Sequence, residues 1–181
     1  MKFKNLWKSI LSWALYIAVI LCLASFVNAF VFERTTVEGH SMENTLHDHD
    51  SLVLDKITYH FRDPKRFDII VFPHMLNNEK SYYIKRIIGL PGETLQISEE
   101  GSIYINGKML KEDFGKEVIL NPGIASKKIK LKDDEYFVMG DNRNNSQDSR
   151  DPSVGPVKRE DIIGRAVFRL YPFNNIGVIQ E

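Results

Sequence analysis

The sequence predicts a mainly β body that follows one N-terminal transmembrane helix. The helix is predicted because residues 10–32 contain no charged side chain, and about 20 apolar residues in a helix span the hydrocarbon core of a bilayer. The body is predicted because short runs rich in Val, Ile, Phe and Tyr alternate with turn residues from Thr35 onward, as β-strands do. A chain of 181 residues can bury one good core, so we expect one compact body and an anchor.

The charges before the apolar segment predict its orientation. Lys2, Lys4 and Lys8 precede it, and the cytoplasmic flanks of membrane helices carry an excess of lysine and arginine. We therefore expect a cytoplasmic tail over residues 1–9, an anchor over 10–32, and an extracytoplasmic domain over 33–181.

A cleavable signal peptide is the competing interpretation of this segment. Val27-Asn28-Ala29 presents small residues where a cleavage site would require them. The apolar run exceeds the roughly 7 to 15 residues of a signal-peptide core, which favours the anchor.

The overall composition speaks against a nucleic-acid partner and excludes an intrachain disulfide. The 24 basic residues are balanced by 24 acidic residues, so the charge footprint of a nucleic-acid-binding protein is missing and no such partner is expected. The single cysteine, Cys22, cannot form an intrachain disulfide, so the fold must rest on packing.

Seven runs are predicted to be strands, and turn residues separate them. Leu90-Pro91-Gly92-Glu93 is typical of a tight turn and Asn106-Gly107 of a two-residue hairpin turn, whereas Pro73 is expected to end a strand. Residues 99–134 are polar and rich in lysine, which predicts a small insertion with a solvated face. The predicted strands are residues 51–54, 68–72, 82–88, 94–97, 103–105, 135–139 and 166–171.

Lys85 is a candidate general base. It lies in an apolar strand-like run, where alternation puts it on the face of Tyr83 and Ile87 and opposite Arg86. One of the two adjacent cations is therefore expected to face inward. Burial lowers the pKa of a lysine from about 10.4, which makes the amine a usable base near neutral pH.

Two other polar stretches suggest different chemistry. Residues 140–150 are dense in side chains that bond their own backbone, which predicts a rigid loop in which Asp148 and Arg150 pair or brace their neighbours. His47-Asp48-His49-Asp50 is rich in metal-ligand types, but no second cluster of ligands accompanies it, so no metal is expected. Spacing alone leaves open a Ser-His-Asp triad that uses one of the five histidines.

Ser41 cannot be selected as a nucleophile from its local sequence. Gly39-His40-Ser41-Met42-Glu43 begins like the nucleophile elbow of a hydrolase but lacks its closing glycine.

Taken together, these stretches resemble the conserved boxes of bacterial type I signal peptidases, in the family's order. The resemblance covers nearly the whole chain, and its length resembles that of the compact Gram-positive members. The boxes are the apolar anchor, SMENTL at residues 41–46, RFDIIVF at 66–72, YYIKRIIGLPGE at 82–93 and GDNRNNSQDSR at 140–150.

The resemblance implies roles for individual residues. Ser41 matches the nucleophile, Lys85 the lysine that takes its proton, and Ser146 the hydroxyl that orients the lysine, while Asp148 and Arg150 match a structural ion pair. The residues that match the lining of pockets for small substrate side chains are Val37, Met42, Val71, Tyr83 and Ile84.

The resemblance also implies the fold and the activity. The fold would be a twisted, barrel-like antiparallel β body with its cleft close to the outer membrane surface. The protein would be a membrane-bound serine endopeptidase that removes N-terminal signal peptides from exported preproteins by Ser-Lys acyl transfer after small P1 residues. Its partners would be signal peptides and the lipid bilayer, with no metal or organic cofactor, and we expect a monomer in the cell membrane.

Three positions depart from the family pattern. Asn44 stands where a proline is usual, so the turn behind Ser41 loses a fixed φ. Gly39 stands where some members place an oxyanion-binding serine, so the oxyanion would rely more on the backbone N–H of Ser41. Phe67 replaces a usual glycine, and nothing in the sequence explains it.

Two alternative functions share these features. A self-cleaving repressor-type protease has the same Ser-Lys pair, but the anchor and the lack of a DNA-binding helical domain speak against it. A non-catalytic relative that serves as an assembly or chaperone component at the cell surface is favoured mainly by Asn44, since Ser41 and Lys85 are both retained.

Overall fold

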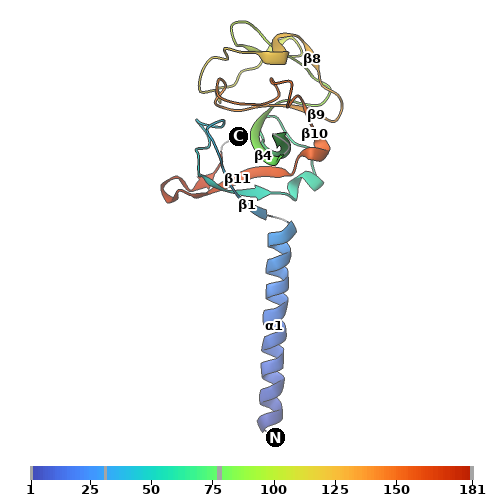
Figure 1. The fold of residues 1–181 in the computed structure, drawn as a ribbon. Coiled ribbons are helices and arrows are strands. Elements are labelled where there is room, and N and C mark those ends of the chain that lie inside the picture. The colour runs from blue at the N-terminus through green and yellow to red at the C-terminus, as the bar shows by residue number, and fades with distance from the viewer. Residues whose placement is uncertain (1, 31, 77–78, 180–181) are drawn as a thin grey trace.

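The computed structural model describes residues 2–30, 32–76 and 79–179. Helix α1 (Lys2–Phe30) leads into a body of two antiparallel sheets, and α1 projects from one end of that body (Figure 1). Short 3-10 turns cover Thr58–His60, Gly123–Ser126, Arg159–Asp161 and Phe173–Asn175.

The larger sheet holds the predicted site, and its strand order is β1-β2-β11-β3-β4-β9-β10, with β12 paired to β11. Because the chain returns from β11 to lie between β2 and β3, the centre of the sheet joins segments far apart in sequence. Its strands are β1 (Phe32–Thr36), β2 (Ser51–Asp55), β3 (Ile69–Leu76), β4 (Glu79–Gly89), β9 (Glu135–Met139), β10 (Val157–Lys158), β11 (Gly164–Tyr171) and β12 (Gly177–Val178).

The smaller sheet has the order β7-β6-β5-β8 and lies at the end of the body opposite α1 (Figure 1). Most of it comes from residues 99–134, so the expected insertion is an integral layer whose Ile103, Ile119 and Leu131 are buried in the core. Its strands are β5 (Thr94–Ile97), β6 (Ile103–Ile105), β7 (Lys108–Met109) and β8 (Ile129–Lys130).

The expected mainly β class and all seven expected strands are confirmed, with boundaries shifted by a few residues. The hairpin turn is confirmed as well, because Asn106 and Gly107 have φ of 51° and 79° between β6 and β7. The tight turn closes with a hydrogen bond of 3.1 Å from the Glu93 N–H to the Leu90 carbonyl. Strand β1 was not predicted, because its sequence, FERTT, contains charged residues and no apolar run.

The expectation that Pro73 ends a strand is wrong. Pro73 lies inside β3, opposite Tyr82 of β4. Among the described residues β11 pairs with β3 only at Ile70 and Val71. Beyond Val71 one side of β3 is therefore an edge, where a residue without an N–H is tolerated.

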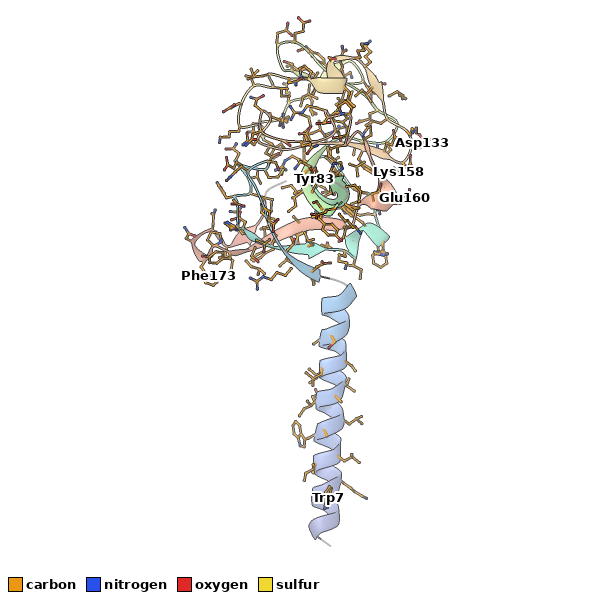
Figure 2. All side chains as sticks on the ribbon, in the orientation of Figure 1. Trp7, Tyr83, Asp133, Lys158, Glu160 and Phe173 are labelled. Carbon is orange, nitrogen blue, oxygen red and sulfur yellow. The ribbon has the colours of Figure 1, made fainter. Side chains whose placement is uncertain are left out.

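The expected anchor, residues 10–32, is helical up to Phe30, residue 31 lies outside the described residues, and Phe32 begins β1. Residues 27–29, the possible cleavage site, belong to the same helix. In the part of the chain that the structure describes, no helix is long and apolar enough to cross a membrane. Trp7 projects from α1 away from the body (Figure 2), and Trp13 and Ile17 of the same helix are exposed as well.

Two departures from the family pattern have a backbone explanation. Phe67 has a φ of 75°, so the usual glycine reflects a left-handed backbone at this position. The Phe67 ring packs 4.9 Å from that of Phe114, which offsets the strain. Asn44 has a φ of 102°, which a proline cannot adopt, so the turn behind Ser41 follows a different path from one built around proline.

The strain at Phe67 predicts an unusual order of stabilities. Phe67→Ala and Phe67→Gly remove the same ring contact, but only glycine adopts a positive φ without strain. We therefore expect the alanine variant to be less stable than the glycine variant by about 1 kcal/mol, measured by urea unfolding of the full chain.

The matched control is Phe61, which is exposed and has a φ of −114°. There the alanine variant should be at least as stable as the glycine variant. The same order of stabilities at both positions would contradict the assignment of strain to Phe67.

Candidate active site

Ser41 lies in a tight turn that follows β1. The turn is closed by hydrogen bonds from the Thr45 and Leu46 N–H groups to the Met42 carbonyl, at 3.0 and 2.8 Å. Met42 and Leu46 are buried and anchor the turn in the core. The apolar residues that follow Ser41 therefore hold the turn, and the Ser41 side chain lines a cleft.

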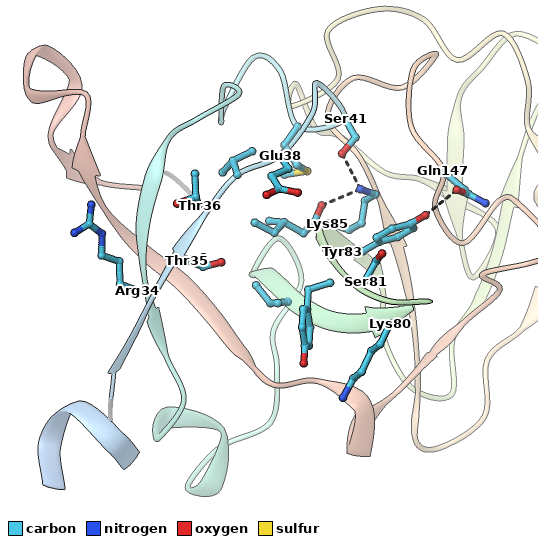
Figure 3. A pocket seen from close by; sticks show the side chains of 15 residues that line it. Arg34, Thr35, Thr36, Glu38, Ser41, Lys80, Ser81, Tyr83, Lys85 and Gln147 are labelled. Atoms are coloured by element: carbon cyan, nitrogen blue, oxygen red, sulfur yellow. Dashed lines mark hydrogen bonds between the residues drawn. The ribbon is translucent and has the colours of Figure 1, made fainter. Parts of the chain in front are cut away.

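Lys85 comes from β4 and meets Ser41 across the cleft. Its Nζ lies 2.7 Å from Ser41 Oγ and donates a second hydrogen bond of 3.0 Å to the Ile84 carbonyl (Figure 3). The side chain is only 4% exposed. Desolvation by burial lowers the pKa of Lys85 to about 8, while the charges of Asp148 and Asp141 act in the opposite direction.

Arg86, the next residue, is also fully buried, so both adjacent cations face the interior. Its guanidinium forms two hydrogen bonds of 2.9 Å with the Asp141 carboxylate and lies 3.8 Å from the Phe114 ring centroid. Strand alternation predicted only one inward cation and did not predict the Arg86–Asp141 pair. The sequence feature that could have indicated this pair is Asp141, an acidic residue at the start of the polar loop.

The Arg86–Asp141 pair reaches the turn that holds Ser41. Thr45 Oγ1 donates to Asp141 Oδ2 at 2.6 Å. The Asn142 N–H donates to the Ser41 carbonyl at 3.1 Å, and Asn142 Nδ2 donates to the His40 carbonyl at 3.0 Å. The loop after β9 therefore holds the backbone on both sides of the Ser41 hydroxyl.

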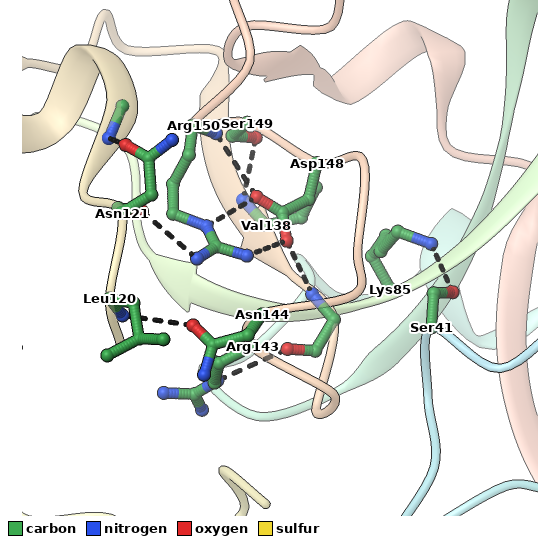
Figure 4. A network of polar contacts seen from close by, with 12 residues as sticks. Ser41, Lys85, Leu120, Asn121, Val138, Arg143, Asn144, Asp148, Ser149 and Arg150 are labelled. Carbon is green, nitrogen blue, oxygen red and sulfur yellow. Dashed lines mark hydrogen bonds and ion pairs between the residues drawn. The ribbon is translucent and has the colours of Figure 1, made fainter. Parts of the chain in front are cut away.

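Asp148 and Arg150 form the ion pair that the sequence predicted. Both side chains are buried and joined by two bonds of 2.8 Å (Figure 4). Asp148 also accepts the Gly140 N–H at 3.0 Å. The pair thus fixes the loop against the end of β9.

Ser146 is not hydrogen-bonded to Lys85. Its Oγ is buried and has no hydrogen-bond partner among the described residues. A side chain on Gly140 would lie 2.3 Å from both Ser146 Oγ and the Ser41 carbonyl, so glycine is required for this close approach.

The five residues predicted to bind substrate all line one cleft beside Ser41 and Lys85 (Figure 3). The cleft has a volume of about 670 Å³, with residues 34–38 along one wall and residues 80–85 along the other. Gln147 also lines the cleft, and no sequence pattern indicated this residue.

The histidine-rich segment has structural bonds. Asp48 accepts the Gly39 N–H at 2.8 Å, and Asp50 pairs with Arg169 at 2.9 Å. In the described chain no group of three or more His, Cys, Asp or Glu side chains is placed to hold a metal ion. Each of the five histidines is described, and none hydrogen-bonds Ser41 Oγ, so the geometry favours a Ser-Lys pair over a triad.

The backbone N–H of Ser41 is available to an incoming oxyanion. Among the described residues it donates no hydrogen bond. Gly39 has a φ of 90°, where a serine would be strained. The chain therefore offers a main-chain donor at Ser41 rather than a hydroxyl donor at position 39.

The chain matches a known protein family over most of its length. The family described as signal peptidase, peptidase S26, matches residues 10–171. A signal peptidase I of Bacillus amyloliquefaciens is 39% identical over 175 residues, which cover 93% of this chain and 91% of that protein. A probable signal peptidase I-2 of Synechocystis is 41% identical over 168 residues, which cover 91% of this chain and 73% of that protein.

A solved structure is also similar in sequence. It is the crystal structure of a signal peptidase I from Enterococcus faecalis, with 36% identity and a TM-score of 0.45, and the match covers 57% of this chain and 97% of that one.

Proposed function

This chain belongs to the signal peptidase family, peptidase S26, and we propose that it removes signal peptides from exported preproteins with Ser41 as nucleophile and Lys85 as general base. The observation that supports these roles most directly is the 2.7 Å contact of Ser41 Oγ with the buried amine of Lys85. An amine that titrates near pH 8 is neutral often enough at physiological pH to accept a proton.

The first half of the reaction forms an acyl-enzyme. Neutral Lys85 takes the proton of the Ser41 hydroxyl as Oγ attacks the carbonyl carbon of the scissile bond. The backbone N–H of Ser41 donates to the oxyanion that forms. The C–N bond then breaks, and the leaving amine takes the proton from the Lys85 ammonium.

The second half regenerates the enzyme. Lys85, neutral again, takes a proton from water as that water attacks the ester carbonyl, and the C–O bond to Ser41 breaks as Oγ recovers the proton. Ser-Lys pairs are an accepted variant of the triad mechanism, and each step uses groups that this chain supplies.

The remaining residues support substrate binding and the pair itself. We assign Val37, Met42, Val71, Tyr83 and Ile84 to the walls of shallow pockets for small P1 and P3 side chains of an extended peptide, because these residues line the cleft between two extended segments. Asp148 and Arg150 brace the loop. Ser146 is assigned a supporting role near the Ser41 carbonyl rather than a bond to Lys85.

We also propose that the helical part of the expected anchor, residues 10–30, holds the protein in the cell membrane, with the N-terminus cytoplasmic and the body outside. From Ile10 to Phe30 the helix carries no charged residue, and a helix that is apolar on all sides is suited to a protein core or a bilayer. The described side chains of this segment are exposed. Phe173, an exposed apolar residue, lies at the end of the body nearest α1 (Figure 2), and the exposed ring of Tyr171 lies 5.5 Å from it.

Ser41→Ala and Lys85→Ala are each expected to abolish cleavage of a labelled preprotein, by at least about a thousandfold in kcat/KM, because one removes the nucleophile and the other its base. The assay uses the full chain in detergent, and circular dichroism checks that both variants remain folded. Single His→Ala variants at all five positions serve as controls and should retain activity. Loss of cleavage in a histidine variant together with an active Lys85→Ala variant would instead support a triad.

The anchor predicts that the full chain stays in the membrane pellet after an alkaline wash. Ile17→Arg combined with Ile20→Arg should shift it to the supernatant, since an arginine at the centre of a membrane helix costs about 2.5 to 3.5 kcal/mol. The matched control is Val118→Arg, an exposed apolar position on the body. Release of the wild-type chain by the wash, or an unchanged pellet for the double variant, would argue against the anchor.

A further inference from the structure

Gln147 is the residue through which the 140–150 loop reaches the cleft. Among the described residues it is the loop's sole contribution to the cleft lining beside Ser41. Its Oε1 accepts a hydrogen bond of 2.8 Å from the hydroxyl of Tyr83, and Figure 3 shows the two side chains joined next to Lys85.

A directional chain of hydrogen bonds fixes the Gln147 amide. Asp151 accepts from both the backbone N–H and the hydroxyl of Ser153, at 2.8 Å each, and these bonds lower the pKa of Asp151. Since the Ser153 hydroxyl donates to that carboxylate, it accepts from Gln147 Nε2, at 3.0 Å. The amide oxygen must then face Tyr83, which donates to it.

Tyr83, at the end of this chain of hydrogen bonds, forms part of the cleft wall. Its ring centroid lies 5.0 Å from Lys85 Nζ and 4.7 Å from the His74 ring. The ring is half-buried, so packing holds one side while the other faces the cleft. The hydroxyl contact with Gln147 is therefore the bond that opposes rotation of the ring.

We propose that Gln147 is a positioning residue that fixes the Tyr83 ring beside Lys85 and thereby limits the size of the substrate side chain accepted next to the scissile bond. This inference rests on the proposed function, in which Tyr83 lines the pocket for a small P1 residue. Gln147 acts through Tyr83 and takes no part in proton transfer.

The test compares two matched preproteins with Ala or Leu at P1. Tyr83→Phe removes the hydroxyl but keeps the ring, and Gln147→Leu removes both amide groups at similar volume. Each variant should lower the ratio of kcat/KM for Ala over Leu by about fivefold, the factor that corresponds to one hydrogen bond of ordinary net strength. The double variant should lose no more than either single variant, because both remove the same bond.

Gln147→Glu is the conservative variant, because its carboxylate still accepts from Tyr83 although it cannot donate to Ser153; it should therefore keep more of the wild-type ratio than Gln147→Leu does. A changed pKa of Lys85 cancels in this ratio, since one enzyme at one pH cuts both substrates. Wild-type ratios in Tyr83→Phe and Gln147→Leu, or losses that add in the double variant, would overturn the inference.

A measurement of peptide binding tests the positioning role of Gln147 separately from the proposed catalytic function. In a Ser41→Ala background, the same variants should lower the Ala-over-Leu ratio of peptide affinities, measured by fluorescence anisotropy. If the wild-type chain cuts neither preprotein but the affinity ratios change as expected, the proposed function fails and the positioning role stands. Normal cleavage with unchanged ratios would reject the positioning role alone.

Discussion

The site depends on keeping Lys85 buried without a counter-ion. The two carboxylates whose charges act on it, Asp141 and Asp148, each form two bonds with an arginine, Arg86 and Arg150 respectively. Neither carboxylate forms an ion pair with the lysine among the described residues. Because a pKa of about 8 lies well below the ordinary 10.5, burial disfavours the protonated amine by about 3 kcal/mol.

The same two pairs hold the geometry that the lysine needs. Asp141 bonds Thr45 in the turn of Ser41 and Arg86 in the strand of Lys85, so one carboxylate links the nucleophile to the base. Asp148 fixes the other end of the loop through Gly140. A buried ion pair contributes little net stability, and its value here is the position that it imposes on three segments distant in sequence.

Local sequence patterns predicted the strands, but they did not predict which strands far apart in the sequence pair with each other. The runs around Lys85 and residues 135–139 were recognised because β-branched and aromatic residues alternate with turns, but no pattern shows that β11 lies between β2 and β3. Lys85 was selected as a candidate base from its place in an apolar strand, whereas Ser41 and its pairing with Lys85 were identified only through the family resemblance, since the contact between them spans 44 positions. Arg86 was hidden because a strand buried on both faces does not alternate, and the positive φ of Phe67 was hidden because only a glycine would have signalled it.

The central claim is that burial lowers the pKa of Lys85 far enough for part of the amine population to be neutral beside Ser41 near physiological pH, and an NMR titration of the lysine side chains tests it most directly. In the wild-type chain the Lys85 signal, identified by its loss in Lys85→Met, should titrate with a midpoint near pH 8. The base is then protonated and inactive well below that pH, and activity rises as the pH approaches it. A midpoint near the ordinary value of about 10.4 would contradict the account, because the amine would stay charged and unable to accept the proton of Ser41.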